Sequence, residues 1–201
     1  MRLAQRRPSW AVGFGDEVWW SRLAQPEQHR WVEAGEPPRL YDLQRPKGDP
    51  DPKALACYGL WLCHGREPQG QMRLRFVQGR PVSAVTIDFL AWCSQRLRQQ
   101  GIEALVLIWD NASWHVSQAV RSWLREHNRK VKATGEGARI VAFNLPVKSP
   151  WLNPIEAKWV HGKRAVSEAE RLLGADELES RVYAYYGCDP EDHLVMPQKV
   201  A

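Results

Sequence analysis

The chain has 201 residues, a formal net charge of +5 and an isoelectric point near 9.2, with 44% hydrophobic and 25% charged residues. This length suits one compact domain, and the composition excludes intrinsic disorder, coiled coil and collagen. The longest wholly apolar run, ALVLIW at residues 104–109, is too short to cross a bilayer, and no apolar segment follows the basic amino terminus. We therefore expect a cytoplasmic protein without a membrane partner, and its mild basic excess permits a nucleic-acid partner.

Two residue types are informative. The four cysteines lie far apart in sequence and form no CxxC pair, so we expect free thiols in the core and neither disulfides nor a zinc site. The eleven tryptophans are unusually many for this length. We expect most of them to be buried, which leaves a few for stacking on nucleobases.

The first half of the chain has the pattern of strands. Alternating and β-branched residues predict strands over residues 10–20, 54–63 and 72–77. Residues 26–53 between the first two hold six prolines, so we expect irregular structure there, with a loose hairpin around Trp31 and Tyr41.

Helices and strands alternate in the second half. Helical spacing of apolar residues predicts helices over residues 82–97 and 116–127, and continuous apolar runs predict buried strands over residues 103–109 and 139–145. A polar loop, KATGEG, precedes the last strand, and further helices are expected from residue 153 onward and over residues 176–186. This order implies parallel crossovers joined to an antiparallel meander. It is compatible with an α/β, ribonuclease H-like fold: a mixed five-stranded sheet flanked by helices.

Three acidic residues lie where such a fold could gather them. Asp16 is on the first strand, Asp110 directly follows the apolar run ALVLIW, and Glu156 begins a helix. Carboxylates bind hard divalent cations, and two ions about 4 Å apart can activate the attacking oxygen and stabilise the leaving oxygen of a phosphodiester. Clustered carboxylates also repel one another, and a bound cation relieves that repulsion. The trio therefore indicates metal-dependent phosphodiester chemistry.

Spacing alone leaves a simpler alternative open for each acid. Asp16 could be a turn acid beside a glycine, and the pair Asp110-Asn111 could form a strand-to-helix turn. Glu156 could cap the helix that the segment NPIE begins, since Asn, Pro and Glu stand there in a near-ideal capping order.

Two longer motifs resemble the core of DDE transposases, in the bacterial insertion-sequence branch related to mariner elements. DNASWH at residues 110–115 is similar to that family's Asp-Asn-x-x-x-His block, and SPWLNPIEAKW at residues 149–159 to its Ser-Pro-x-Leu-Asn-Pro-Ile-Glu-x-x-Trp block. The metal-binding Asp and Glu of those blocks map onto Asp110 and Glu156. The family's first carboxylate begins an Asp-Glu block on the opening strand, which matches Asp16-Glu17.

The resemblance extends from about residue 10 to about residue 165 and implies a transposase catalytic domain, which we place at residues 1–187 with a C-terminal tail at residues 188–201. It implies metal-dependent DNA cleavage and strand transfer, with two Mg²⁺ or Mn²⁺ ions held by the three acids. It also implies double-stranded DNA as partner, at element ends and TA-containing targets, a homodimer, and a place of action at the nucleoid.

The sequence departs from the family pattern in two places. Family members normally carry a helix-turn-helix region before the first acid, whereas only 15 residues precede Asp16 here. We therefore expect a separate polypeptide to recognise the element ends. The spacer between Asp110 and Glu156 is long, with KATGEG as the expected insertion.

Basic residues near the acids are candidates for DNA contacts. Lys163 shares a helix face with Glu156 and is the favoured phosphate contact, with Lys148 and Arg164 as further candidates. His115 could contact a scissile phosphate or orient a carboxylate through a hydrogen bond. The alternatives are a solvated basic surface for the cations and packing against the preceding tryptophan for the histidine.

Two other functions fit the same sequence. A decayed or domesticated transposase would be a non-catalytic DNA-binding remnant, although its three acids are intact. A stand-alone nuclease of the same fold would cleave DNA without joining strands.

Overall fold

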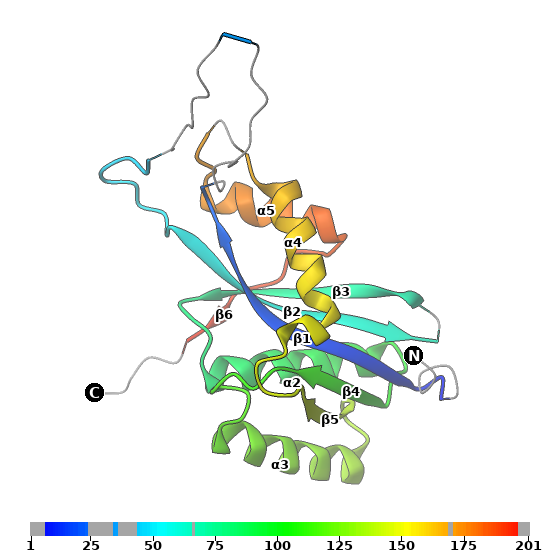
Figure 1. Cartoon of the computed structure of the whole chain (residues 1–201). Helices are drawn as coiled ribbons and strands as arrows, with labels where there is room; N and C mark the ends of the chain where they lie inside the picture. Colours follow the sequence, from blue (N-terminus) through cyan, green and yellow to red (C-terminus); the bar gives the residue numbers. More distant parts are fainter. Residues whose placement is uncertain (1–6, 24–33, 36–43, 66, 169–170, 197–201) are drawn as a thin grey trace, which may run out of the picture.

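The computed structural model describes residues 7–23, 34–35, 44–65, 67–168 and 171–196. One sheet, with strand order β5-β4-β1-β2-β3-β6, has helices packed against it (Figure 1). In chain order the elements are β1 (Trp10–Ser21), β2 (Ala54–His64), β3 (Glu67–Gln78), α2 (Ser83–Gln99), β4 (Ala104–Trp109), α3 (Gln118–Thr134), β5 (Arg139–Asn144), the short 3₁₀ helix η1 (Pro150–Leu152), α4 (Pro154–Val166), α5 (Ala175–Tyr186) and β6 (Leu194–Val195).

The pairing of the strands makes the sheet mixed. β1, β2 and β3 form the expected antiparallel meander, while β4 pairs parallel with β1 and β5 parallel with β4. The sheet has six strands among the described residues, one more than predicted. The additional strand, β6, lies in the segment predicted to be a C-terminal tail and pairs parallel with β3. Two residues are too few to give an alternation pattern, which explains why the sequence did not indicate this strand.

Two other differences concern the connections. Helix α3 continues to Thr134, so the first half of KATGEG is helical, and Gly135 ends the helix in a left-handed conformation with φ 72°. Gly187 ends α5 in the same way, as predicted. The hairpin expected around Trp31 and Tyr41 lies outside the described residues.

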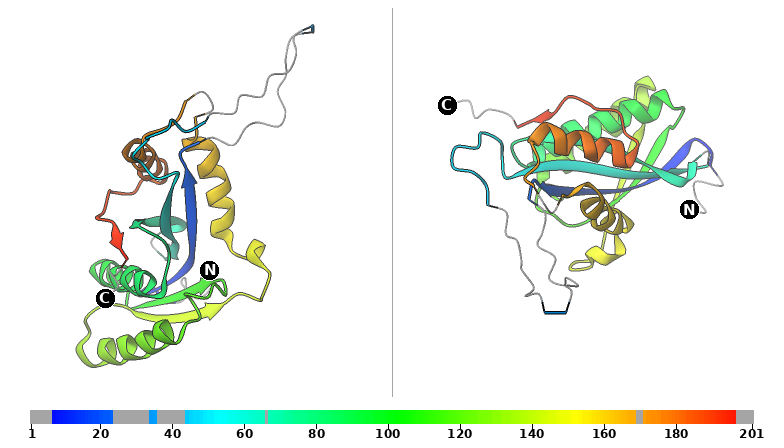
Figure 2. Two further views of the ribbon diagram at one scale, coloured as in Figure 1. Left: turned by 90° about the vertical axis from the view of Figure 1, so that its left-hand side faces the viewer. Right: turned by 90° about the horizontal axis from the view of Figure 1, so that it is seen from above.

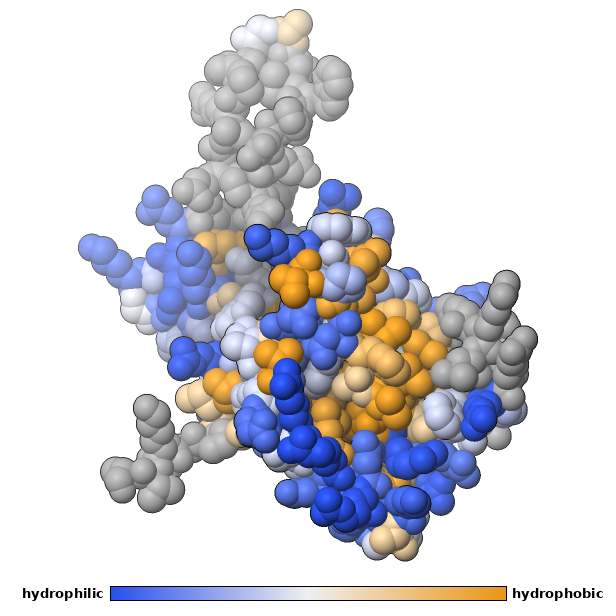
Figure 3. Space-filling view, turned by 60° about the horizontal axis from the view of Figure 1, so that its bottom comes forward, coloured by the Kyte–Doolittle hydropathy of each residue, from blue (hydrophilic) through white to orange (hydrophobic). Residues whose placement is uncertain are grey.

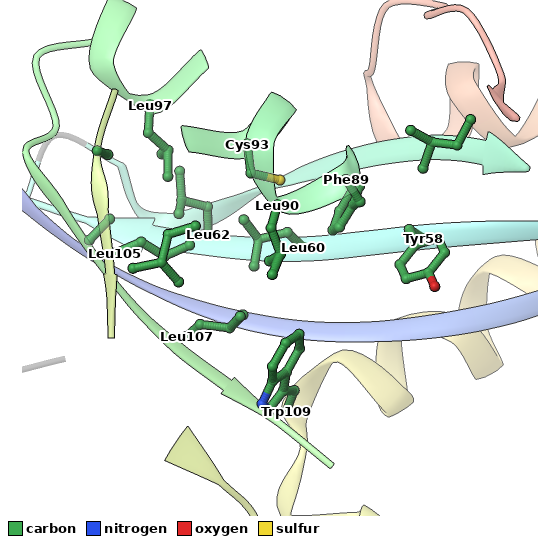
Figure 4. Close-up of a cluster of buried hydrophobic side chains, with 14 of the residues drawn as sticks. Tyr58, Leu60, Leu62, Phe89, Leu90, Cys93, Leu97, Leu105, Leu107 and Trp109 are labelled. Atoms are coloured by element: carbon green, nitrogen blue, oxygen red, sulfur yellow. The ribbon is translucent and has the colours of Figure 1, made fainter. Parts of the chain in front are cut away.

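The first core lies between the sheet and the helices α2 and α3. Alternate residues of β2 and β4 point into it, among them Leu60, Leu62, Leu105 and Leu107, and α2 contributes Phe89 (Figure 4). All four cysteines are free, as predicted. Among the helices of the described residues, none combines the length and apolarity that a membrane crossing needs.

The second core lies against the helices α4 and α5. Trp20 of β1 packs edge-on against Trp159 of α4 and Tyr186 of α5, with ring centroids 6.0 and 6.1 Å apart. Figure 2 shows α4 on the opposite side of β1 from α2. At the closest approach of α4 to the sheet, the Trp159 ring occupies the space above Gly59, where a side chain would otherwise stand.

We expect Gly59→Ala to destabilise the protein, because the added methyl would overlap the Trp159 ring. Overpacking of this kind costs about 2 kcal/mol, and urea unfolding measures it. Gly174→Ala is the matched control, since its methyl would meet open space at a φ of −67°. Equal stability of the two variants would show that α4 does not pack as closely as described.

Candidate active site

Asp16 and Asp110 lie at the same level on two neighbouring parallel strands. The pairing of β1 with β4 reaches Phe14 opposite Ile108, and each acid comes two residues further along its chain. Asp16 remains within β1, opposite Gly59 of β2, so it is a strand residue and not a turn acid. β4 ends one residue before Asp110. The two acids therefore stand side by side at the carboxyl end of β4, the position at which open α/β sheets bind ligands.

Asp16 is largely buried beside two other acids. Burial raises the pKa of its carboxyl, and the negative charges of Glu156 and Glu17 raise it further, to about 7. Trp159 opposes this effect because its indole Nε1–H donates a hydrogen bond of 2.9 Å to Asp16 Oδ2. A carboxyl with such a pKa is only partly ionised at neutral pH, which reflects its burial first and the neighbouring negative charges second.

Two side chains of the α4 segment form hydrogen bonds to β1 at Gly15 and Asp16. Asn153 Nδ2 donates to the backbone carbonyl of Gly15 at 3.0 Å, and Trp159 donates to Asp16 itself. Asn153 is the N-cap residue of α4, yet its side chain makes no capping bond. Glu156 lies three residues from each of these anchors, so the helical repeat places it near the anchored side of α4, next to the sheet.

Glu156 connects the three acids electrostatically. Burial raises the pKa of Glu156, the negative charge of Asp110 raises it further, and the positive charge of Lys163 lowers it. Glu156 also raises the pKa of Asp16, so it acts on both strand acids. Lys163, seven residues further along α4, is the cation whose charge acts on Glu156.

His115 orients Asp110. Its Nδ1 is 2.8 Å from Asp110 Oδ1, its Nε2 is 2.8 Å from Glu17 Oε1, and its ring stacks on Trp109 at 4.3 Å. Burial alone would lower the pKa of His115, but its hydrogen bonds to the two carboxylates outweigh burial and raise the pKa to about 9. The charged ring then donates from both nitrogens, and its bond lowers the pKa of Asp110. Asp110 Oδ1 also accepts from the Ala112 amide, so it makes the predicted turn as well.

Glu17 is a residue of this site to which the sequence argument gave no role. It holds His115 through Oε1 and accepts a bond of 3.0 Å from the Trp114 indole through Oε2. The signal available in the sequence was the adjacency of two acids on one strand. Neighbouring strand residues point to opposite faces of a sheet, so Asp16 and Glu17 lie on different faces. Glu17 therefore belongs to the site through His115 and not as a neighbour of Asp16 on the same face.

The other predicted cations lie outside this group of contacts. Lys148 and Arg164 are both exposed, and neither makes a described contact with the three carboxylates. Lys148 has a φ of 59°, the one positive value among the described non-glycine residues. Its backbone is therefore held in the left-handed region, which is uncommon for a lysine.

The donor set at this edge fits hard divalent cations. It offers three carboxylates, and among the described residues Asn153 Oδ1 is the one buried side-chain oxygen without a hydrogen-bond partner. No three ligating side chains of the described residues already form a group that could hold an ion. Glu156 raises the pKa of Asp16, and Asp110 raises the pKa of Glu156, so a bound cation would relieve a repulsion between these carboxylates.

The ribonuclease H-like fold expected from the sequence is confirmed by solved structures. Mos1 transposase in a paired-end complex with the left transposon end is similar to this chain with a TM-score of 0.65 at 16% identity, over 94% of this chain and 52% of that one. The Mos1 mariner paired-end complex with Mn gives 0.60 at 18% identity, over 92% and 51%. A pre-cleavage Mos1 transpososome gives 0.61 at 15% identity, over 94% and 52%. The chain thus spans about half the length of these Mos1 chains.

The sequence profile of the DDE superfamily endonuclease family matches residues 11–179, a range that holds the three acids and the elements that carry them. The chain belongs to this family. A comparison with curated proteins finds no match.

We expect Asp16→Asn to stabilise the metal-free protein near pH 8. The raised pKa of Asp16 means that the folded state binds its proton more tightly than the unfolded state does. The wild-type protein therefore loses stability as the pH rises from about 4 to about 7, whereas the amide, which still accepts the Trp159 bond, does not. Urea unfolding in chelator should show a gain of about 2 kcal/mol at about pH 8 and almost none at about pH 4.

The control for this measurement is Asp189→Asn, because Asp189 is exposed. It should change stability little at either pH. If Asp16→Asn gave no gain at the higher pH, the raised pKa of Asp16 would be refuted.

Proposed function

We propose that the chain is the catalytic domain of an insertion-sequence transposase, which cleaves DNA and transfers the cut strand to a new site. The proposal is supported by the strand register that brings Asp16 and Asp110 to the same level, and by the electrostatic effect of Glu156 on Asp16 and of Asp110 on Glu156. Membership of the DDE superfamily endonuclease family supports the same chemistry.

The three acids are proposed to bind two Mg²⁺ or Mn²⁺ ions. When bound, such ions activate the attacking oxygen and stabilise the leaving oxygen of an in-line displacement. Support comes from the donor types and from the Mos1 structures, which were determined as paired-end complexes with Mn and with Mg. Asp16, Asp110 and Glu156 then act as ligands and not as general bases.

The residues around Asp110 keep its carboxylate ionised and oriented, as metal binding requires. Protonated His115, held by Glu17, keeps Asp110 ionised and fixes its orientation. We propose that Lys163, with Lys148 and Arg164 further out, contacts DNA phosphates. Water attacks the phosphodiester at the element end in the first step. The released 3′-hydroxyl then attacks a TA-containing target.

Double-stranded DNA is the proposed partner. Residues 1–187 are the proposed catalytic domain, and the strand β6, which follows this range, pairs with β3 of its sheet. Mos1 transposase binds paired transposon ends in the structures similar to this chain. We therefore propose a homodimer for pairing the ends. The place of action is the nucleoid in the cytoplasm.

Asp110→Asn should lower metal-dependent nicking of supercoiled DNA by more than about 100-fold, because it removes a ligand charge while keeping the size of the side chain. Gel separation of nicked and supercoiled plasmid in Mn²⁺ measures the loss, and circular dichroism checks the fold. Asp88→Asn, an exposed acid on α2, is the matched control and should nick like the wild-type protein. Full activity of Asp110→Asn would contradict the proposal.

The joining of cleaved ends to a second duplex separates a transposase from a nuclease. The wild-type protein should yield joined oligonucleotides in the same Mn²⁺ reaction. Cleavage without any joining would assign the chain to the stand-alone nucleases, and binding without cleavage would assign it to the DNA-binding remnants.

A further inference from the structure

An apolar surface lies beside the proposed active site. Ile140 and Ala142 of the edge strand β5 point into the core, so Val141 and Phe143 point to the other face of the sheet, where Phe143 is 56% exposed. Figure 3 shows a broad hydrophobic area on this side of the molecule, with hydrophilic side chains along its borders. Contiguous exposed apolar areas with a polar border can mark binding sites.

The loop that follows β5 adds the most exposed aromatic side chain of this area. Trp151 is 73% exposed, and it stands five residues before Glu156. Val147 and Leu152 of the same loop and Val160 of α4 are also exposed. We call these four residues, together with Phe143, the Trp151 surface.

Hydrogen bonds tie the start of this loop to Asp110. Asn111 Nδ2 donates to the carbonyl of Leu145 at 2.6 Å, and Asn144 Nδ2 donates to the carbonyl of Asp110 at 2.9 Å. The Leu145 amide donates to the carbonyl of Trp109 at 2.8 Å. The Trp151 surface is therefore held next to the acids at both of its ends, since α4 follows directly and carries Glu156.

Basic side chains on the loop and on α4 could meet the phosphates of a polyanion, while the acids lie at the proposed metal site beside them. Residues 137–155 contain no acidic side chain and two basic ones, Arg139 and Lys148. On α4, Lys158, Lys163 and Arg164 outnumber the single acid Glu156. An apolar protein partner would not need this excess of positive charge, whereas a nucleic-acid strand brings both phosphates and the flat apolar faces of bases.

We propose that the Trp151 surface binds nucleobases that are unpaired and unstacked next to the scissile phosphate, with the Trp151 indole stacking on one of them. This inference rests on the proposed function, because it takes DNA as the substrate of the adjacent site. Bases inside a duplex do not offer their faces, so the surface selects strand ends and locally opened DNA. Stacking accepts every base, and the preference is therefore for unpaired structure and not for sequence.

The test compares the binding of two labelled DNAs by fluorescence anisotropy without divalent ions, so that no cleavage occurs. One probe is a blunt duplex, and the other is the same duplex with a few unpaired nucleotides at one 3′ end. The wild-type protein should bind the second probe about 10-fold more tightly. Trp151→Ala should remove that preference with little effect on the blunt duplex, and Trp151→Phe should keep most of it.

Tyr185→Ala is the matched control, because Tyr185 is an aromatic residue on α5 that is 45% exposed. It should keep the full preference. The proposal is overturned if Trp151→Ala binds both probes as the wild type does, or weakens both equally. It is also overturned if Trp151→Ala converts a dimer into a monomer in sedimentation, since a second copy would then cover the surface. A protein that keeps the preference but never nicks DNA in Mn²⁺ would contradict the proposed function and support this inference.

Discussion

The docking of α4 onto β1 is the contact on which the site depends, because Glu156 is the one acid of the three that stands on a helix, and not on a strand or directly after one. Asn153 and Trp159 bond to β1 at Gly15 and Asp16, and the missing side chain of Gly59 makes room for the Trp159 ring. The tryptophan thus has two tasks, since it packs the second core and also bonds a carboxylate of the site. A shift of α4 would move Glu156 and release Asp16 together.

Like charges gathered at one edge make the site costly for the fold. The pairs of His115 with Asp110 and Glu17 offset part of this cost, because a buried cation between two carboxylates satisfies all three groups. No cation lowers the pKa of Asp16 among the described residues, and burial together with the charges of Glu156 and Glu17 raises it. Unfavourable local interactions that the rest of the fold must offset are typical of functional sites. Here the unfavourable interaction is repulsion between carboxylates, which a bound divalent cation would relieve.

Sequence patterns predicted the features that depend on local periodicity. The strand before Asp110 and the helix that carries Glu156 both follow from residue spacing and were found. The prediction of five strands missed β6, because two residues are too few to show the alternation that identifies a strand.

What the sequence could not indicate depends on contacts between distant segments. Glu17 meets His115 across 98 positions, and no local rule predicts such a pair. Asn153 has an ideal identity for a helix cap, but its side chain bonds to β1 because tertiary packing brings a carbonyl within reach. The sequence left a few tryptophans for stacking on nucleobases, and the structure shows that Trp151 is exposed, because burial depends on which distant segments cover a side chain.

The most direct test of the central claim is a crystal of the wild-type protein grown or soaked with Mn²⁺ and measured for anomalous scattering. The account predicts manganese peaks bound by oxygen atoms of Asp16, Asp110 and Glu156, with the three carboxylates drawn closer together than in the metal-free protein. Peaks elsewhere on the chain, or none near these side chains at saturating Mn²⁺, would contradict it.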